Sequence, residues 1–328
     1  MNQSLLKIKG LTVEYWTQNK YSAAVDCVDF ELEQGEIFGL VGESGCGKST
    51  LGKSIFKLLP EAANISQGEI IYKDKNIIEM GEKEINSEIR GKEIAMVIQN
   101  PQNALNPVFK VGRQILDILY FKSTENVSRK ELKPRAIEML DKMGIPDPEH
   151  RFDEYPHQFS GGMKQRVMLA MAFITNPSLL IADEPTTALD VTIEAQILSL
   201  LEDLVEEFNT SILYITHDLG VVSELTDKIA VMYSGKIVES VPTDDLFQDP
   251  LHPYSEALLK CLPGTKQEEK LETIPGSVPD INNRPVGCNF QPRCEYSFDR
   301  CANYEPEMYE VDDDRRVSCF LYREGRTG

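Results

Sequence analysis

The sequence predicts an α/β fold organised around a phosphate-binding loop. Residues 42–50 spell GESGCGKST, with an apolar run of strand character before them at 37–41 and a helix-like stretch after them at 51–59. A strand, a glycine-rich loop ending in Gly-Lys-Ser and a helix together form such a loop. Two further strand-like apolar runs, 179–182 and 212–216, each lead into ionisable side chains. Strand ends beside a phosphate loop are where open α/β sheets place functional groups.

The residues of the phosphate loop predict a site for a nucleoside triphosphate and Mg²⁺. The glycines let the backbone curl so that successive N–H groups point at one centre, and the following helix adds the partial positive charge of its N-terminus. Lys48 can reach the β- and γ-phosphates, and the Ser49 hydroxyl can ligate Mg²⁺. The expected nucleotide contacts come from most of the loop: Gly42, Ser44, Gly45, Cys46, Gly47, Lys48, Ser49 and Thr50.

Composition and charge narrow the class of protein. The chain has 328 residues, enough for roughly two domains, and its 41% hydrophobic and 27% charged residues are ordinary for a globular protein. The formal net charge of −19 disfavours non-specific nucleic-acid binding. No apolar run approaches the ~18 residues of a transmembrane helix, and MNQSLLKIKG lacks the apolar core of a signal peptide. We therefore expect a cytoplasmic protein, and other chains must span the membrane if it works at one.

The beginning of the chain is expected to be rich in β-structure. The alternation in SLLKIKGLTVEYW predicts an edge strand, and VDCVDFELEQGE predicts a second strand that ends in a turn. Tyr15 and Trp16 lie at the end of the first of these strands. Such an aromatic side chain can stack on a nucleotide base or can be an ordinary strand residue, and the spacing leaves both interpretations open.

The middle of the chain predicts a strand followed by a helical insertion. Gln99 ends the apolar run in EIAMVIQ, which places a polar side chain at a strand end near the phosphate loop. Helical periodicity then predicts one helix around 115–119 and another around 132–143.

A glycine pair marks the start of the next predicted helix. Ser160 is a favourable N-cap for a helix that runs to about Thr175. Gly161 and Gly162 weaken a helix, so their presence favours the close approach of another group to the backbone, and a phosphate is the natural candidate.

Ionisable side chains follow the two later strands. Asp183 and Glu184 end the first; one carboxylate can hold Mg²⁺ and the second can orient or deprotonate water. His217 ends the second strand. A lone histidine is usually structural, but a place at a third strand end of one nucleotide sheet favours a functional role.

These motifs resemble those of the ATP-binding subunits of ABC transporters, over nearly the whole length of the chain. The motifs occur in the order of that family: phosphate loop, glutamine loop (Gln99), signature motif (Ser160, Gly161, Gly162), Walker B pair (Asp183, Glu184), D-loop (Ala188, Leu189, Asp190) and switch histidine (His217). Within the family the chain is similar to the dipeptide and oligopeptide importer ATPases, on stretches such as QNPQNALNP, DEPTTALDVTIEAQI, HPYSEALL and IPGSVPDINNRPVGCNFQPRC. Met163 departs from the glutamine frequent in the wider family, although methionine is common in this branch.

The resemblance implies a domain organisation. The expected fold is an ABC-type P-loop ATPase cassette, a RecA-like core with an antiparallel β subdomain and a helical subdomain. This nucleotide-binding domain would cover residues 1–255, with the helical subdomain at about 100–175. A small cysteine-containing extension would follow at 256–328.

The resemblance also implies roles for the motif residues, with ATP as the nucleotide. The expected catalytic residues are Glu184 as general base, His217 on the γ-phosphate and Gln99 as γ-phosphate sensor. Mg²⁺ would be held by Ser49, Gln99 and Asp183. The signature residues Ser160, Gly161 and Gly162 would act in trans on the ATP of an opposing subunit, beside the D-loop residue Asp190. Tyr15 becomes the favoured adenine-stacking residue, with Trp16 and Tyr21 as alternatives.

The implied partners are those of a membrane importer. We expect a second, identical or homologous ATPase subunit, two transmembrane permeases, an indirect link to an extracellular solute-binding protein, and no nucleic acid. The chain would lie peripherally on the cytoplasmic face of the cell membrane. Peptide is the first expectation for the cargo, with oligosaccharide or nickel as alternatives. A soluble, non-transport ABC ATPase is disfavoured because the chain has one cassette, a short helical insertion and strong acidity.

Four of the seven cysteines crowd near the end of the chain: Cys288, Cys294, Cys301 and Cys319. In a cytosolic protein such a cluster predicts a metal site before disulfides. Zinc sites usually use cysteine pairs two to four residues apart, and the wider spacing here favours a [4Fe–4S] cluster, with Zn²⁺ as the alternative. The family resemblance points the same way. The alternative of unligated or disulfide-bonded cysteines stays open. For a metal site we expect a structural role rather than a redox one.

Overall fold

In a computed structural model, the protein is described at residues 4–99, 104–123, 127–187, 189–262 and 273–322. The chain divides into two compact units. The first combines Met1–Ile78 with Tyr214–Gly328, and the second is Glu79–Leu213. Among the described residues, no helix has the length and apolar character needed to cross a membrane.

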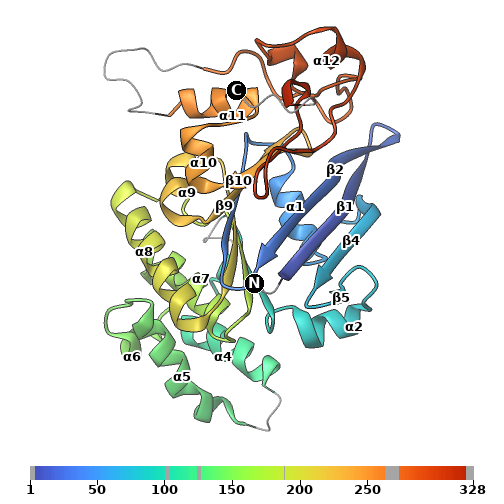
Figure 1. Cartoon of the computed structure of the whole chain (residues 1–328). Coiled ribbons are helices and arrows are strands. Elements are labelled where there is room, and N and C mark those ends of the chain that lie inside the picture. The colour runs from blue at the N-terminus through green and yellow to red at the C-terminus, as the bar shows by residue number, and fades with distance from the viewer. Residues whose placement is uncertain (1–3, 100–103, 124–126, 188, 263–272, 323–328) are drawn as a thin grey trace. The chain divides into compact units, whose positions relative to one another are not determined.

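The first unit begins with an antiparallel sheet in the order β2-β1-β4-β5 (Figure 1). Its strands are β1 (Ser4–Thr17), β2 (Lys20–Glu33), β4 (Ala63–Tyr72) and β5 (Lys75–Asn76). The sequence prediction of an edge strand at the N-terminus is wrong, because β1 pairs with β2 on one side and with β4 on the other. β4 lies far along the chain, and no local pattern in β1 announces this second partner.

A second set of strands in this unit carries the phosphate loop. β3 (Ile37–Val41) pairs in parallel with β9 (Lys228–Tyr233), which pairs antiparallel with β10 (Lys236–Pro242). All five residues of β3 are buried, as expected for a strand covered on both faces. The order continues from β10 to two short strands, β12 (Arg316–Val317) and β11 (Tyr309–Glu310).

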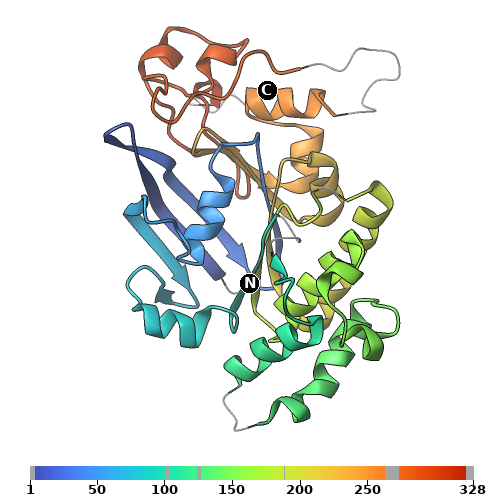
Figure 2. The ribbon, with the colours of Figure 1, turned by 180° about the vertical axis from the view of Figure 1, so that it is seen from behind.

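The helices of the first unit include α1 (Lys48–Ile55), α9 (Leu219–Leu225), α10 (Thr243–Gln248), α11 (Pro253–Lys260) and α12 (Asp299–Asn303), with 3-10 turns at η3 (Gln291–Arg293) and η4 (Phe320–Tyr322). In the views of Figures 1 and 2, α1 lies beside β1 and β2. α1 begins and ends earlier than the predicted stretch 51–59. The left-handed backbone at Lys57, with φ of 48°, explains the early end.

The second unit contains two parallel strands and most of the long helices. β6 (Ile94–Val97) pairs in parallel with β7 (Leu179–Asp183). The other elements are α2 (Glu82–Glu84), the π-turn η1 (Ile85–Ile89), α4 (Val111–Lys122), α5 (Arg129–Lys142), α6 (Pro148–Arg151), η2 (Pro156–Gln158), α7 (Gly161–Phe173) and α8 (Val191–Phe208). α4, α5 and α7 confirm the predicted helices of the insertion. β8 (Ser211–Thr216) runs across the boundary between the units.

The C-terminal part of the chain is packed on the core of the first unit. Phe290 and Val317 belong to the same buried cluster as Tyr233 of β9 and Tyr254 of α11. The rings of Tyr233, Tyr254 and Phe290 contact one another, with centroids 4.6–5.3 Å apart. This segment therefore has an apolar core, which it shares with the strands that follow the phosphate loop.

Gly39 in β3 gives a test of how tightly the strand before the loop is packed. A Cβ atom there would lie 2.5 Å from Cγ1 of Val222 in α9. We expect Gly39→Ala to lower the free energy of unfolding by about 1–3 kcal/mol, the usual cost of overpacking a core. Urea denaturation measures this change. Gly81→Ala is the control, because a Cβ at Gly81 meets no atom within 4 Å; equal losses in both variants would contradict the packing argument.

Candidate functional site

The phosphate loop connects β3 to α1 through three glycines with positive φ. The angles are 153° at Gly42, 82° at Gly45 and 113° at Gly47. A Cβ at Gly42 would lie 2.1 Å from the carbonyl oxygen of Met232, and one at Gly47 would lie 2.4 Å from that of Ala24. Only glycine fits at these two positions, because backbone atoms cannot move aside as a flexible side chain can.

Lys48 lies over this loop and is almost fully buried. Its Nζ donates to the carbonyl oxygens of Gly42, at 2.7 Å, and Glu43, at 3.1 Å. The neighbouring Cys46 thiol is buried, and burial raises its pKa so that the thiol stays neutral. The Cys46 carbonyl accepts the N–H of Gly235, which ties the loop to the turn between β9 and β10. The ammonium group of Lys48 is therefore held against the backbone of the phosphate loop.

The three aromatic residues considered for adenine stacking differ in their surroundings. The hydroxyl of Tyr15 in β1 lies 3.3 Å from Oγ1 of Thr50 in α1, so Tyr15 is linked to the helix that follows the phosphate loop. Trp16 and Tyr21 are more than half exposed and pack on each other, with ring centroids 4.9 Å apart. This arrangement favours Tyr15 as the adenine-stacking residue, an assignment that stays a prediction.

His217 lies in the first unit, directly after β8. It is exposed, and Asp218 caps α9 by accepting the N–H of Gly220 at 2.8 Å. His217 thus lies between the end of β8 and the start of α9, at the strand end that the sequence predicts.

In the second unit, parallel strands bring Gln99 and Glu184 together. β6 and β7 end at the same edge, and Nε2 of Gln99 donates to Oε2 of Glu184 at 2.5 Å. Oγ1 of Thr187 donates to the same oxygen at 3.1 Å. Asp183, the last residue of β7, is buried. Glu184 has a positive φ of 48°, which is uncommon outside glycine.

The signature residues open α7 as predicted. Ser160 caps the helix by accepting the N–H of Met163 at 3.3 Å. A Cβ at Gly161 would meet no atom within 4 Å, whereas one at Gly162 would lie 2.8 Å from Ile193 of α8. Gly162 is therefore needed for packing against α8, whereas no neighbouring atom restricts a side chain at Gly161.

The D-loop residue Asp190 caps α8 by accepting the N–H of Ile193 at 3.0 Å. Ala188, which the D-loop motif also includes, lies outside the described residues.

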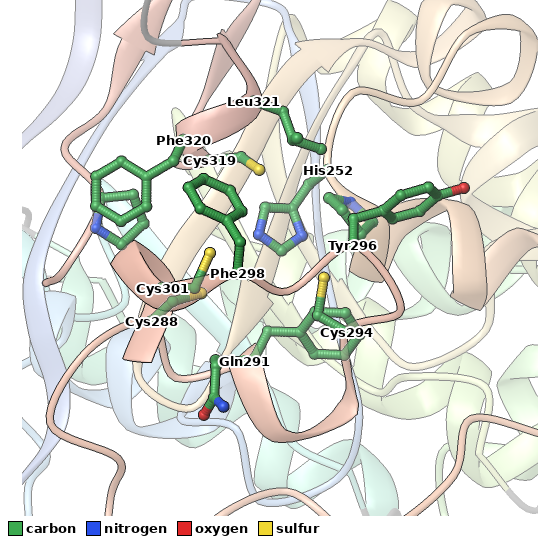
Figure 3. A pocket seen from close by; sticks show the side chains of 13 residues that line it. His252, Cys288, Gln291, Cys294, Tyr296, Phe298, Cys301, Cys319, Phe320 and Leu321 are labelled. Atoms are coloured by element: carbon green, nitrogen blue, oxygen red, sulfur yellow. The ribbon is translucent and has the colours of Figure 1, made fainter. Parts of the chain in front are cut away.

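The prediction of a metal centre is contradicted. The four C-terminal cysteines do line one cavity of about 20 Å³, but they share it with apolar and aromatic side chains (Figure 3). Burial raises the pKa of Cys288 to about 11 and that of Cys319 to about 12, because apolar surroundings disfavour the charged thiolate. Within the described part of the chain, no cluster of three or more histidine, cysteine, aspartate or glutamate side chains is arranged to hold a metal ion. Neither the expected [4Fe–4S] cluster nor its Zn²⁺ alternative is supported.

Comparison with known proteins gives matches over both parts of the chain. The family model "ABC transporter" matches residues 25–187, and the model "Oligopeptide/dipeptide transporter, C-terminal region" matches residues 238–301. The oligopeptide transport ATP-binding proteins OppD and AppD of Bacillus subtilis are 46% and 47% identical over 97% and 98% of this chain, and over 88% and 98% of their own lengths. The dipeptide transport ATP-binding protein DppD of Haemophilus influenzae is 43% identical over 96% of this chain and 95% of its own.

Solved structures show the same fold. One is the dimeric ATP-binding cassette MJ0796 bound to ADP and Pi, with a TM-score of 0.65 and 28% identity over 73% of this chain and 99% of that one. Another is cbiO1 from Clostridium perfringens, part of the cbiONQ transporter complex, with a TM-score of 0.65 and 27% identity over 76% of this chain and 92% of that one.

The fold and the motif residues define an ATP-hydrolysing cassette of the P-loop class. The chain belongs to the ABC transporter family, in the branch of the oligopeptide and dipeptide transport ATP-binding proteins. The predicted family and cassette fold are thereby confirmed.

Sequence reasoning missed the groups that hold the phosphate loop from outside. The backbone N–H of Glu43 donates to the hydroxyl of Tyr254 at 2.9 Å. The stretch HPYSEALL, which contains Tyr254, is typical of the branch but does not by itself predict a contact with the phosphate loop. Its contact with a loop more than two hundred residues away has no local signal in the sequence.

Lys48 gives the direct test of the phosphate loop. A charge-assisted hydrogen bond contributes about 1.5–3 kcal/mol, so Lys48→Ala should weaken ATP binding roughly tenfold to a hundredfold. Titration of the purified chain with a fluorescent ATP analogue measures this loss. Lys53→Ala removes an equal charge from the last turn of α1 and should bind ATP like the wild type; the assignment fails if the two variants bind alike.

Proposed function

We propose that this chain is the ATP-hydrolysing motor subunit of a membrane importer for di- or oligopeptides. The observation that carries the proposal is the match over almost the full length of both chains to oligopeptide transport ATP-binding proteins, which includes the C-terminal region. Oligosaccharide or nickel is the alternative cargo for the same motor. A soluble, non-transport ATPase is a distant alternative.

The phosphate loop suits ATP. Gly42 and Gly47 leave no room for side chains, and the ammonium of Lys48 lies over the loop. When bound, Mg²⁺·ATP supplies the phosphoryl group and a cation that offsets its charge. Ser49, Asp183 and Gln99 are the proposed side chains for the metal.

Glu184 is the proposed general base. Its carboxylate already accepts hydrogen bonds from Gln99 and Thr187, and these hold the oxygen in a defined direction. A carboxylate in this position can accept a proton from a water molecule that attacks the γ-phosphate. His217 is proposed to donate to the γ-phosphate, and Tyr15 to stack on the adenine.

The signature residues are proposed to act on the nucleotide of a second ATPase subunit, identical or homologous, in a head-to-tail pair. Gly161 has the open backbone that such a contact needs. Ser160 at the helix start adds a polar side chain and the partial positive charge of α7. Asp190 would lie at the same contact.

Two permease subunits are the proposed membrane partners, and exposed apolar residues of the second unit are the proposed contacts. Val108 is 74% exposed and Phe109 is 46% exposed, although both are large apolar residues. Leu105, a few residues before them, is buried and therefore belongs to the core of the second unit. We place the chain peripherally on the cytoplasmic face of the membrane, with the solute-binding protein reached only through the permeases.

The proposed domain division is a nucleotide-binding domain at residues 1–255 and a C-terminal extension at 256–328.

Replacing the base separates binding from turnover. Glu184→Gln should keep ATP affinity and lower turnover by about 10²–10⁴-fold, the usual contribution of a general base. Phosphate release by the assembled transporter measures turnover. Glu202→Gln, an exposed acid on α8, is the matched control and should hydrolyse ATP normally. Wild-type turnover in Glu184→Gln would remove Glu184 from this role.

Peptide uptake tests the proposed function as a whole. Vesicles that contain the chain, its permeases and a solute-binding protein should take up a labelled oligopeptide only with ATP. Phe109→Ala should reduce this uptake severalfold without changing ATP binding by the isolated chain, because an anchor residue of an interface contributes more than about 1 kcal/mol. Tyr304→Ala, exposed on the C-terminal extension, serves as control. Uptake of nickel or an oligosaccharide instead of peptide would contradict the proposed substrate but not the proposed role as ATPase subunit.

A further inference from the structure

An arginine of the C-terminal extension reaches into the phosphate loop. Nη1 of Arg293 donates to Oε2 of Glu43 at 2.7 Å, and Nη2 donates to Oε1 at 3.1 Å. This two-pronged arrangement is the strongest geometry for an arginine–carboxylate pair. The Arg293 side chain is only 4% exposed, so the pair is well shielded from water on the arginine side.

The surroundings of Arg293 fix it in place. Its Nε donates to the carbonyl oxygen of Pro275 at 2.8 Å, and its guanidinium lies 5.7 Å from the ring centroid of Tyr233. Phe290, three residues before it, packs on the rings of Tyr233 and Tyr254. Since Tyr254 also accepts the N–H of Glu43, both the backbone and the side chain of this loop residue are held from outside the loop.

The extension makes a second, independent contact with the nucleotide-binding part of this unit. Oδ1 of Asn282 accepts from the hydroxyls of Thr17 and Ser22, at 2.7 and 2.8 Å. Its carbonyl oxygen accepts from Nζ of Lys20 at 2.8 Å. These three residues belong to the β1–β2 hairpin that also carries Tyr15. The extension therefore contacts both elements expected to meet the nucleotide, the phosphate loop and the strand bearing the aromatic residue.

The charges at the loop explain why such a contact matters. Glu43 places a carboxylate within a loop that receives a triphosphate, and like charges at short distance repel. Arg293 neutralises this carboxylate and holds it in one position. Loss of Arg293 would leave a partly buried, unpaired negative charge on a residue of the phosphate loop, a condition that disfavours a bound anion as well as the folded loop.

We propose that Arg293 is a positioning residue for ATP binding, which acts through Glu43 and couples the C-terminal extension to nucleotide affinity. The coupling is a property of the first unit and does not depend on the cargo. It requires only that the phosphate loop binds ATP, which the Lys48→Ala measurement tests separately. Failure of the nucleotide site and failure of the coupling are therefore distinguishable.

The test measures ATP affinity and hydrolysis in the full chain. Arg293→Gln should raise the Kd for a fluorescent ATP analogue about tenfold, within the usual range of coupling between sites, while kcat at saturating ATP changes little. Adding Glu43→Gln to this variant should restore the Kd to within about threefold of the wild type, because no unpaired carboxylate remains. A role for Arg293 that does not act through Glu43, such as its packing on Tyr233, predicts no such rescue.

Arg315→Gln is the matched control. Arg315 lies in the same extension but pairs with Asp249 instead, at 3.0 Å, and its loss should leave the Kd unchanged. Arg293→Lys retains the charge without the fork and should give an intermediate Kd; it also serves if Arg293→Gln does not fold. A wild-type Kd in the folded Arg293 variants, no rescue by Glu43→Gln, or an equal defect in Arg315→Gln would each overturn the proposal.

Discussion

The nucleotide site depends on how closely the backbone of the phosphate loop approaches its neighbours. Gly42 lies against the carbonyl of Met232 and Gly47 against that of Ala24, at distances that exclude any side chain. The parallel pairing of β3 with β9 brings Met232 there, because Val41 and Val231 are register partners. The curl of the loop is therefore fixed jointly by its glycines and by the strands of the unit. The glycines of GESGCGKST therefore act together with this strand pairing.

Much of the fold is predictable because its signals are local. The cap at Ser160, the apolar run of β7 and the periodicity of α4 and α5 each lie within a few residues of the element they define. The candidate site is likewise visible as strand ends that carry polar groups. The interior position of β1 is different, because it is set by the return of β4, and no pattern within β1 distinguishes one partner from two.

The cysteine cluster shows where spacing alone misleads. The positions of four cysteines in the chain suggest a ligand set, and the fold does gather them around one cavity. Ligation, however, also requires the sulfur atoms to converge on one point, and spacing along the chain does not set the direction of each side chain. Within the described residues, no group of three or more histidine, cysteine, aspartate or glutamate side chains is arranged to hold a metal ion. The sequence shows how far apart the four cysteines lie along the chain, whereas the directions of their side chains are set only by folding.

The pair of Arg293 and Glu43 joins residues that lie 250 positions apart in the sequence. A shielded ion pair contributes little net stability, because the cost of removing both charges from water offsets their attraction. Such a pair mainly fixes the positions of its two side chains. Removing one partner destabilises the protein more than replacing both partners by uncharged residues, because it leaves the other charge unpaired. A loop that binds an anion can contain the acidic Glu43 because Arg293 neutralises its carboxylate. The C-terminal extension is then part of the nucleotide site's construction rather than an appendage to a finished cassette.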